Sequence, residues 1–117
     1  MQAGLEVDVS RAPVVVIRLT GEVDVFSAPR LREKIIELVN QGRRLIVVDL
    51  DEVEFLDSTG LGVLVGGLKR LRSHDGEMSL VCNEPRVLRV FELTRLDTVL
   101  PIHQSVTEAV TSMAGGG

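Results

Sequence analysis

Aromatic side chains are scarce in this 117-residue chain, which contains three Phe and neither Trp nor Tyr. The core must therefore be built from Val, Leu and Ile, and flat rings are too few to form a platform on which single-stranded bases stack. Basic residues are in the minority, since 13 Lys and Arg face 17 Asp and Glu and leave a net charge of −4 at pH 7. That sign is wrong for wrapping a phosphate backbone, so we expect no nucleic-acid partner.

Cysteine and long hydrophobic runs are also nearly missing. The single cysteine, Cys82, excludes an internal disulfide and a cysteine-rich zinc site, and we expect it to be a core thiol. We expect neither a metal nor another cofactor. The apolar runs fall far short of the roughly 20 residues of a membrane span, and the first residues lack the pattern of a signal peptide. These absences favour a cytoplasmic protein with no membrane partner.

Strand-like and helix-like patterns alternate along the chain, and its length fits one domain. Strands are predicted near residues 5–9, 14–17, 45–48, 78–82 and 99–102, and helices begin near Ser27, Asp57–Ser58, Pro85 and Ser105. The run 45–48 is continuously apolar, as in a strand that is covered on both faces. This alternation predicts an α/β fold in which parallel strands are joined by right-handed helical crossovers.

The segment after the third predicted strand is the unusual one. Residues 45–57 contain five acids and no base, and Ser58 and Thr59 follow at once. In an open α/β sheet, sites form where strands end and the next helices begin. Capping alone explains Asp57 or Ser58, but it does not explain two adjacent hydroxyl groups.

The same predicted helix carries three interior glycines, Gly62, Gly66 and Gly67. Each costs about 1 kcal/mol relative to Ala. Gly62 and Gly66 lie beside one another on a helix, away from its leucine face. Either this helix packs closely on a neighbouring element there, or the glycines form a smooth surface that a partner protein can approach. The sequence leaves both interpretations open.

Several enzyme classes do not fit this segment. The glycine run lacks the Gly-Lys-Ser/Thr ending of a phosphate-binding loop, and it follows the third strand where a Rossmann motif follows the first. A serine hydrolase needs a histidine beside Ser58, but His74 and His103 lie beyond the far end of the helix and after the last strand. A receiver domain phosphorylated on Asp49 would need paired acids after its first strand. We therefore expect a protein that is a substrate and not an enzyme.

Ser58 at a helix N-terminus is a plausible acceptor of a phosphoryl group. The free N–H groups and the positive helix end tolerate a phosphate, so modification should not unfold the domain. A phosphate adds about −1.5 to −2 charges to a surface already rich in carboxylates. Two unit charges ~6 Å apart interact by roughly 3 kcal/mol at an effective dielectric constant of 20, which is about a hundredfold in binding. The predicted switch therefore acts on an interface and not on the fold.

The motif Asp57-Ser58-Thr59-Gly60-Leu61-Gly62 resembles the signature of the STAS domain, specifically of the bacterial anti-sigma factor antagonists. The segment Leu19-Thr20-Gly21-Glu22-Val23-Asp24 resembles that family's turn after its second strand. The resemblance covers roughly residues 5–112 as a single domain and leaves 113–117 as a flexible tail. It implies a mostly parallel central sheet with one antiparallel N-terminal strand and about four helices.

The resemblance also implies a mechanism of partner switching. An unphosphorylated antagonist binds an anti-sigma factor that is also a serine kinase of the histidine-kinase ATPase fold, which frees a sigma factor. The kinase then phosphorylates the motif serine, here Ser58, the complex dissociates, and a serine phosphatase resets the cycle. Thr59 stands where relatives often have Ser, so a second hydroxyl is available, although we expect Ser58 to be modified.

The resemblance assigns one set of residues to the partner: Glu22, Asp24, Asp57, Ser58, Thr59, Gly60, Leu61 and Gly62. Asp24 among them matches a family position near the acceptor. The alternative within the family is a scaffold or lipid-transport module that has no sigma-factor partner. The sequence leaves the oligomeric state open between a monomer and a weak dimer.

Overall fold

A computed structural model describes residues 3–115, which form nine helices and strands and one short 3-10 turn. In chain order these are β1 (Gly4–Asp8), β2 (Val14–Val23), α1 (Ala28–Asn40), β3 (Leu45–Leu56), α2 (Ser58–Arg72), β4 (Glu77–Val81), α3 (Pro85–Leu93), the 3-10 turn η1 (Leu96–Thr98), β5 (Ile102–His103) and α4 (Val106–Ala114).

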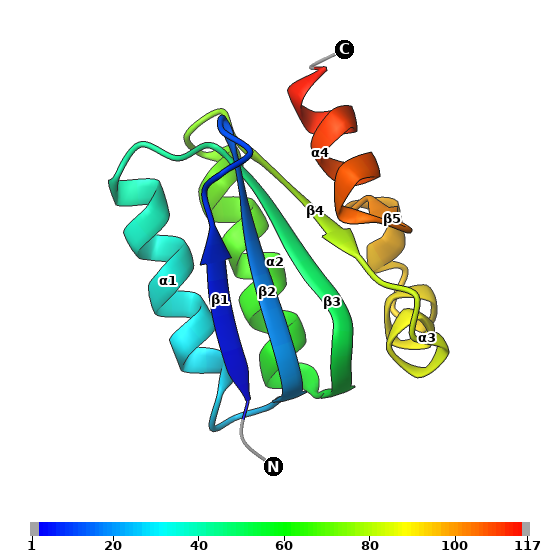
Figure 1. The fold of residues 1–117 in the computed structure, drawn as a ribbon. Helices are drawn as coiled ribbons and strands as arrows, with labels where there is room; N and C mark the ends of the chain where they lie inside the picture. The colour runs from blue at the N-terminus through cyan, green and yellow to red at the C-terminus, as the bar shows by residue number, and fades with distance from the viewer. Residues whose placement is uncertain (1–2, 116–117) are drawn as a thin grey trace.

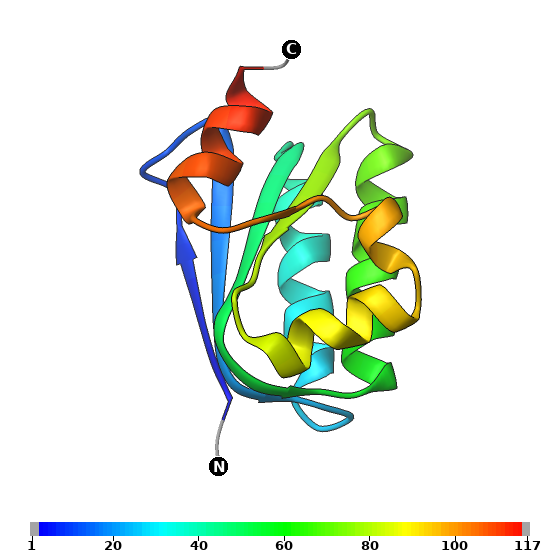
Figure 2. The same ribbon diagram turned by 90° about the vertical axis from the view of Figure 1, so that its right-hand side faces the viewer.

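The five strands form one sheet in the order β1-β2-β3-β4-β5. β1 runs antiparallel to β2, and every other neighbouring pair is parallel. Helices α1, α2 and α3 lie on one side of the sheet and α4 lies on the other (Figures 1 and 2). This arrangement confirms the predicted α/β architecture with one antiparallel N-terminal strand and four helices.

The main core lies between the sheet and the three helices, and a smaller one lies under α4. Alternate residues of β2 and β3 enter the main core, where they meet α1, α2 and the ring of Phe91. Val14, Val16 and Val47 point to the other face and pack against α4. Burial on both faces explains why the central strands are continuously apolar in sequence.

β3 is longer than its sequence suggests. The acidic stretch lies beyond the strand that the sequence predicts at 45–48, but it stays in the strand as far as Leu56. Val53 and Leu56 are buried in the core and pair with Gly21 and Val23 of β2, so two apolar anchors keep an otherwise charged segment extended. The motif that starts at Asp57 therefore begins directly at the end of a strand.

The C-terminal elements differ in detail from the predicted ones. β5 has only two residues and follows Pro101, whose carbonyl accepts a hydrogen bond from the Leu80 N–H. α4 ends at Ala114, and the Met113 sulfur accepts a hydrogen bond from the Ser79 hydroxyl. The expected boundary between the domain and a tail at residue 113 thus falls inside a helix, while residues 116–117 lie outside the described part. Among residues 3–115, no helix combines the length and the apolarity that crossing a membrane requires.

Candidate functional site

Ser58 is the first residue of α2, and Asp57 occupies the N-cap position before it. The Asp57 carboxylate accepts a hydrogen bond from the Gly60 N–H at 2.9 Å, so the cap does not depend on the serine. Ser58 and Thr59 are both exposed. Within residues 3–115 the Ser58 hydroxyl makes no hydrogen bond. The hydroxyl is therefore accessible at the positive end of a 15-residue helix.

The Asp57 carboxylate also joins the start of α2 to the loop between β2 and α1. Its second oxygen accepts a hydrogen bond from the Val25 N–H at 3.1 Å, while the Asp57 N–H donates to the Val23 carbonyl at 3.1 Å. The Asp57 side chain thus accepts hydrogen bonds from two backbone N–H groups: that of Val25, 32 positions away in sequence, and that of Gly60, three positions away. We call this pair of bonds the Asp57 clamp.

Asp24 organises the turn that the clamp holds. Its carboxylate accepts hydrogen bonds from the N–H groups of Phe26 at 2.9 Å and Ser27 at 3.1 Å. The Ser27 N–H, more than any other group, holds the pKa of Asp24 below its ordinary value. Ser27 stands at the N-cap position of α1, but its hydroxyl makes no capping bond to the helix and donates instead to the Glu22 carbonyl at 2.7 Å. The serine at the predicted helix start thus provides no side-chain cap, because the turn uses its hydroxyl.

Gly60 allows the start of α2 to lie directly on the sheet. A Cβ atom there would fall 2.7 Å from Leu56 Cδ1 and 2.8 Å from the Val23 carbonyl oxygen. Leu61, the next residue, is partly buried and packs against the main core. Both residues of the motif therefore serve the placement of the helix, whatever else they contact.

The exposed glycines of α2 behave differently. Within the described part of the chain, a Cβ atom at Gly62 or Gly66 would meet no heavy atom within 4 Å, whereas one at Gly67 would lie 2.9 Å from Ile35 Cδ1. Close packing thus accounts for Gly67 and not for Gly62 or Gly66. Of the two interpretations of these glycines, the geometry favours the smooth surface. That surface continues from Thr59 into a hollow of about 320 Å³ between α1 and α2.

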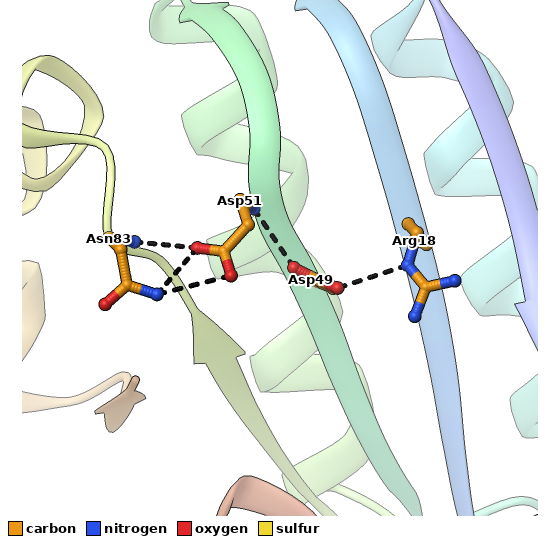
Figure 3. Close-up of polar contacts among 4 residues, drawn as sticks. All are labelled: Arg18, Asp49, Asp51 and Asn83. Atoms are coloured by element: carbon orange, nitrogen blue, oxygen red, sulfur yellow. Dashed lines mark hydrogen bonds and ion pairs between the residues drawn. The ribbon is translucent and has the colours of Figure 1, made fainter. Parts of the chain in front are cut away.

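Part of the acidic segment proves to be structural. The Arg18 guanidinium donates to Asp49 at 3.2 Å, and the other Asp49 oxygen accepts from the Asp51 N–H at 3.0 Å (Figure 3). Asp51 in turn accepts hydrogen bonds from the backbone and side chain of Asn83 at 2.8 and 3.0 Å. These contacts tie β2, β3 and the segment after β4 together. The freely exposed carboxylates of this stretch are those of Glu52 and Glu54.

Neither histidine is placed to activate Ser58. His74 follows the C-terminal end of α2, about 22 Å along the helix by its length, and contacts the Arg70 carbonyl. His103 on β5 pairs with Val81 on β4, and Val81 pairs with Asp49 on β3, which lies nine residues before Ser58. The His103 ring lies 3.9 Å from the Glu108 carboxylate. The geometry of a nucleophile paired with a base is therefore not formed here.

Sequence reasoning missed two exposed apolar residues near Ser58. Val25 is 55% exposed and Phe26 is 90% exposed, and both lie in the turn held by Asp24 and the Asp57 clamp. The only sequence signal was an apolar pair between two turn-forming residues, Asp24 and Ser27. Of the residues predicted to bind a partner, the structure brings Asp24, Asp57 and Ser58 to one edge of the molecule, together with their neighbours in the two motifs.

Comparisons with known proteins identify the family and the fold. A family model described as the STAS domain matches residues 6–109. The anti-sigma-B factor antagonist of Bacillus subtilis (strain 168) is 41% identical over 86 residues, which cover 74% of this chain and 78% of that protein. The crystal structure of an anti-sigma factor antagonist from Mycobacterium paratuberculosis superposes with a TM-score of 0.86 at 30% identity, covering 95% of this chain and 93% of the other. The phosphorylated form of the Bacillus cell fate determinant SpoIIAA superposes with a TM-score of 0.76 at 26% identity, covering 94% and 99% of the two chains.

Proposed function

The chain belongs to the STAS domain family, and on that premise we propose that it is an anti-sigma factor antagonist switched by phosphorylation of Ser58. In its unphosphorylated form it binds an anti-sigma factor that is also a serine kinase, and a sigma factor is released. Transfer of a phosphoryl group to Ser58 ends the complex, and a serine phosphatase restores the unmodified form. The B. subtilis and M. paratuberculosis relatives support the first part of this role, and the phosphorylated SpoIIAA structure supports the second.

The observation that carries the proposal is the accessible hydroxyl of Ser58, which the fold does not use. Asp57 caps α2, so a phosphate on the neighbouring serine removes no hydrogen bond from the helix. The N–H groups at the start of α2 and the helix dipole accommodate the added charge. Phosphorylation therefore leaves the domain folded and changes the surface that a partner meets.

Repulsion explains why the modified form leaves the kinase. To receive a phosphoryl group, the Ser58 oxygen must lie in line with the terminal phosphate of the bound nucleotide. After transfer, the new phosphate faces the remaining nucleotide phosphates, and it also adds to the charge of Asp57 beside it. A pair of charges at ~6 Å and an effective dielectric constant of 20 costs roughly 3 kcal/mol, or about a hundredfold in affinity.

Three variants test the proposal against a kinase-type anti-sigma factor from the same genome, with the anti-sigma-B factor of B. subtilis as a second probe. Ser58→Ala should bind but gain no phosphate in an intact-mass assay with MgATP. Ser58→Asp should melt at the wild-type temperature and bind up to about a hundredfold more weakly. Thr59→Ala, the control for an adjacent exposed hydroxyl, should still be phosphorylated. Full modification of Ser58→Ala, or equal affinity of Ser58→Asp and wild type, would contradict the proposal.

A further inference from the structure

The distribution of phenylalanine points to a second feature of the same edge. Of the three Phe in the chain, Phe91 is fully buried, whereas Phe26 is 90% exposed and Phe55 is 50% exposed. Phe55 pairs with Glu22 near the end of β3, so both exposed rings lie at the edge that carries Ser58. Two of the three rings are therefore exposed at the same end of the sheet, and exposed apolar surface of this kind commonly marks an interaction site.

The turn that presents Phe26 is rigid before any partner arrives. The Val25 N–H is bound by the Asp57 clamp, and the Phe26 N–H donates to Asp24 at 2.9 Å. Both side chains project from a backbone whose donors are already satisfied, and we call these two residues the Val25–Phe26 tip. Because the turn is ordered in advance, docking loses little conformational entropy, which favours tight binding.

The surroundings of the tip are acidic and hollowed. A hollow of about 450 Å³ lies beside Phe26, and among residues 3–115 its lining includes Leu5, Leu31, Glu22, Asp24 and one base, Arg30. A second hollow, on the adjoining end of β3, is lined by four carboxylate side chains, which are those of Asp51, Glu52, Glu54 and Glu84. A partner that covers the tip therefore meets an apolar projection with a predominantly negative rim.

We propose that the Val25–Phe26 tip is the apolar anchor of the complex and inserts into an apolar pocket rimmed by Lys and Arg on the anti-sigma factor. This inference rests on the function proposed above. The Val25–Phe26 tip supplies the binding affinity, and phosphorylation of Ser58 opposes it. Aromatic anchors at the centre of an interface carry most of its binding energy. The charged rims steer association, so the association rate falls as salt is added.

Truncation of the tip tests the inference with a control that the chain provides. Val9 is 51% exposed, close to the 55% of Val25, but lies in the turn after β1 at the opposite end of the sheet. Phe26→Ala should weaken binding to the anti-sigma factor probes at least about thirtyfold, and Val25→Ala should weaken it several-fold. Val9→Ala should bind like wild type. All three variants should melt at or near the wild-type temperature, because the substituted side chains are mostly in water.

The two proposals fail in distinguishable ways. If Phe26→Ala and Val25→Ala bind as tightly as Val9→Ala while Ser58→Asp still loses affinity, the anchor is refuted and the switch stands. If wild-type protein binds neither probe, the partner itself is wrong and both proposals fall. Loss of affinity confined to the tip variants, with an association rate that decreases with salt, supports the anchor.

Discussion

Substituting the glycines of α2 one at a time compares two positions in the same helix that have opposite surroundings. Gly60 is buried against the end of β2, and Gly62 two residues later is exposed. Alanine at Gly60 would place its Cβ 2.8 Å from both Val23 Cγ1 and the Val23 carbonyl oxygen. Because the second of these is backbone, β2 or the start of α2 must move. Alanine at Gly62 would meet no heavy atom within 4 Å.

The expected magnitudes follow from two opposing effects. Replacing an interior helical glycine by alanine gains about 1 kcal/mol of helix propensity. Overpacking of a well-filled site costs about 1 to 3 kcal/mol. Gly62→Ala should therefore raise the free energy of unfolding by about 1 kcal/mol, and Gly60→Ala should lower it by up to about 2 kcal/mol. In a domain of this size the melting temperatures should move by about 4 °C per kcal/mol, in opposite directions.

Urea unfolding followed by circular dichroism at 222 nm measures both effects on the same scale. Similar slopes for the three proteins would show that only the native state changed. If Gly60→Ala proves as stable as Gly62→Ala, the close approach of α2 to β2 is not what requires glycine, and the reasoning is refuted. A destabilised Gly62→Ala would equally contradict the open surface at that position.

Three further outcomes are expected. Arg18→Ala leaves the buried Asp49 carboxylate without its cation. Because Arg18 is itself partly exposed, we expect the free energy of unfolding in urea to fall by about 1 to 2 kcal/mol. An unchanged free energy of unfolding would contradict a stabilising role for the contacts in Figure 3. The pKa of Asp24 is lowered in the fold, so its contribution to stability is complete above the unfolded pKa near 3.8 and disappears as pH falls through the lower folded value. The stability difference between wild type and Asp24→Asn should therefore shrink below about pH 4 in parallel melts, and a constant difference would contradict this. Burial raises the pKa of the Cys82 thiol, so iodoacetamide should label it in native protein only as fast as the domain transiently unfolds around it. Rapid labelling of the native protein in an intact-mass assay would contradict its buried position.

The order of elements could be predicted from the sequence because its signals are local. Continuous apolar runs mark the strands that are covered on both faces, and Pro85 and the pair Asp57–Ser58 mark helix starts that the structure confirms. The place of Ser58 at the start of α2 was also predictable, since it depends only on the cap beside it, while its phosphorylation stays a prediction. The partner-binding roles of Glu22, Thr59 and the other motif residues stay predictions.

What the sequence by itself determined, then, is the α/β order, the single antiparallel strand and a serine hydroxyl at the start of α2. Only the tertiary structure decided which acids are structural, which glycines pack and where the exposed rings gather. These properties depend on residues distant in sequence, as when Arg18 meets Asp49 across 31 positions and Val25 meets Asp57 across 32. A pattern read along the chain reports the neighbours of a residue in sequence, whereas burial and close approach are set by neighbours that only folding brings together.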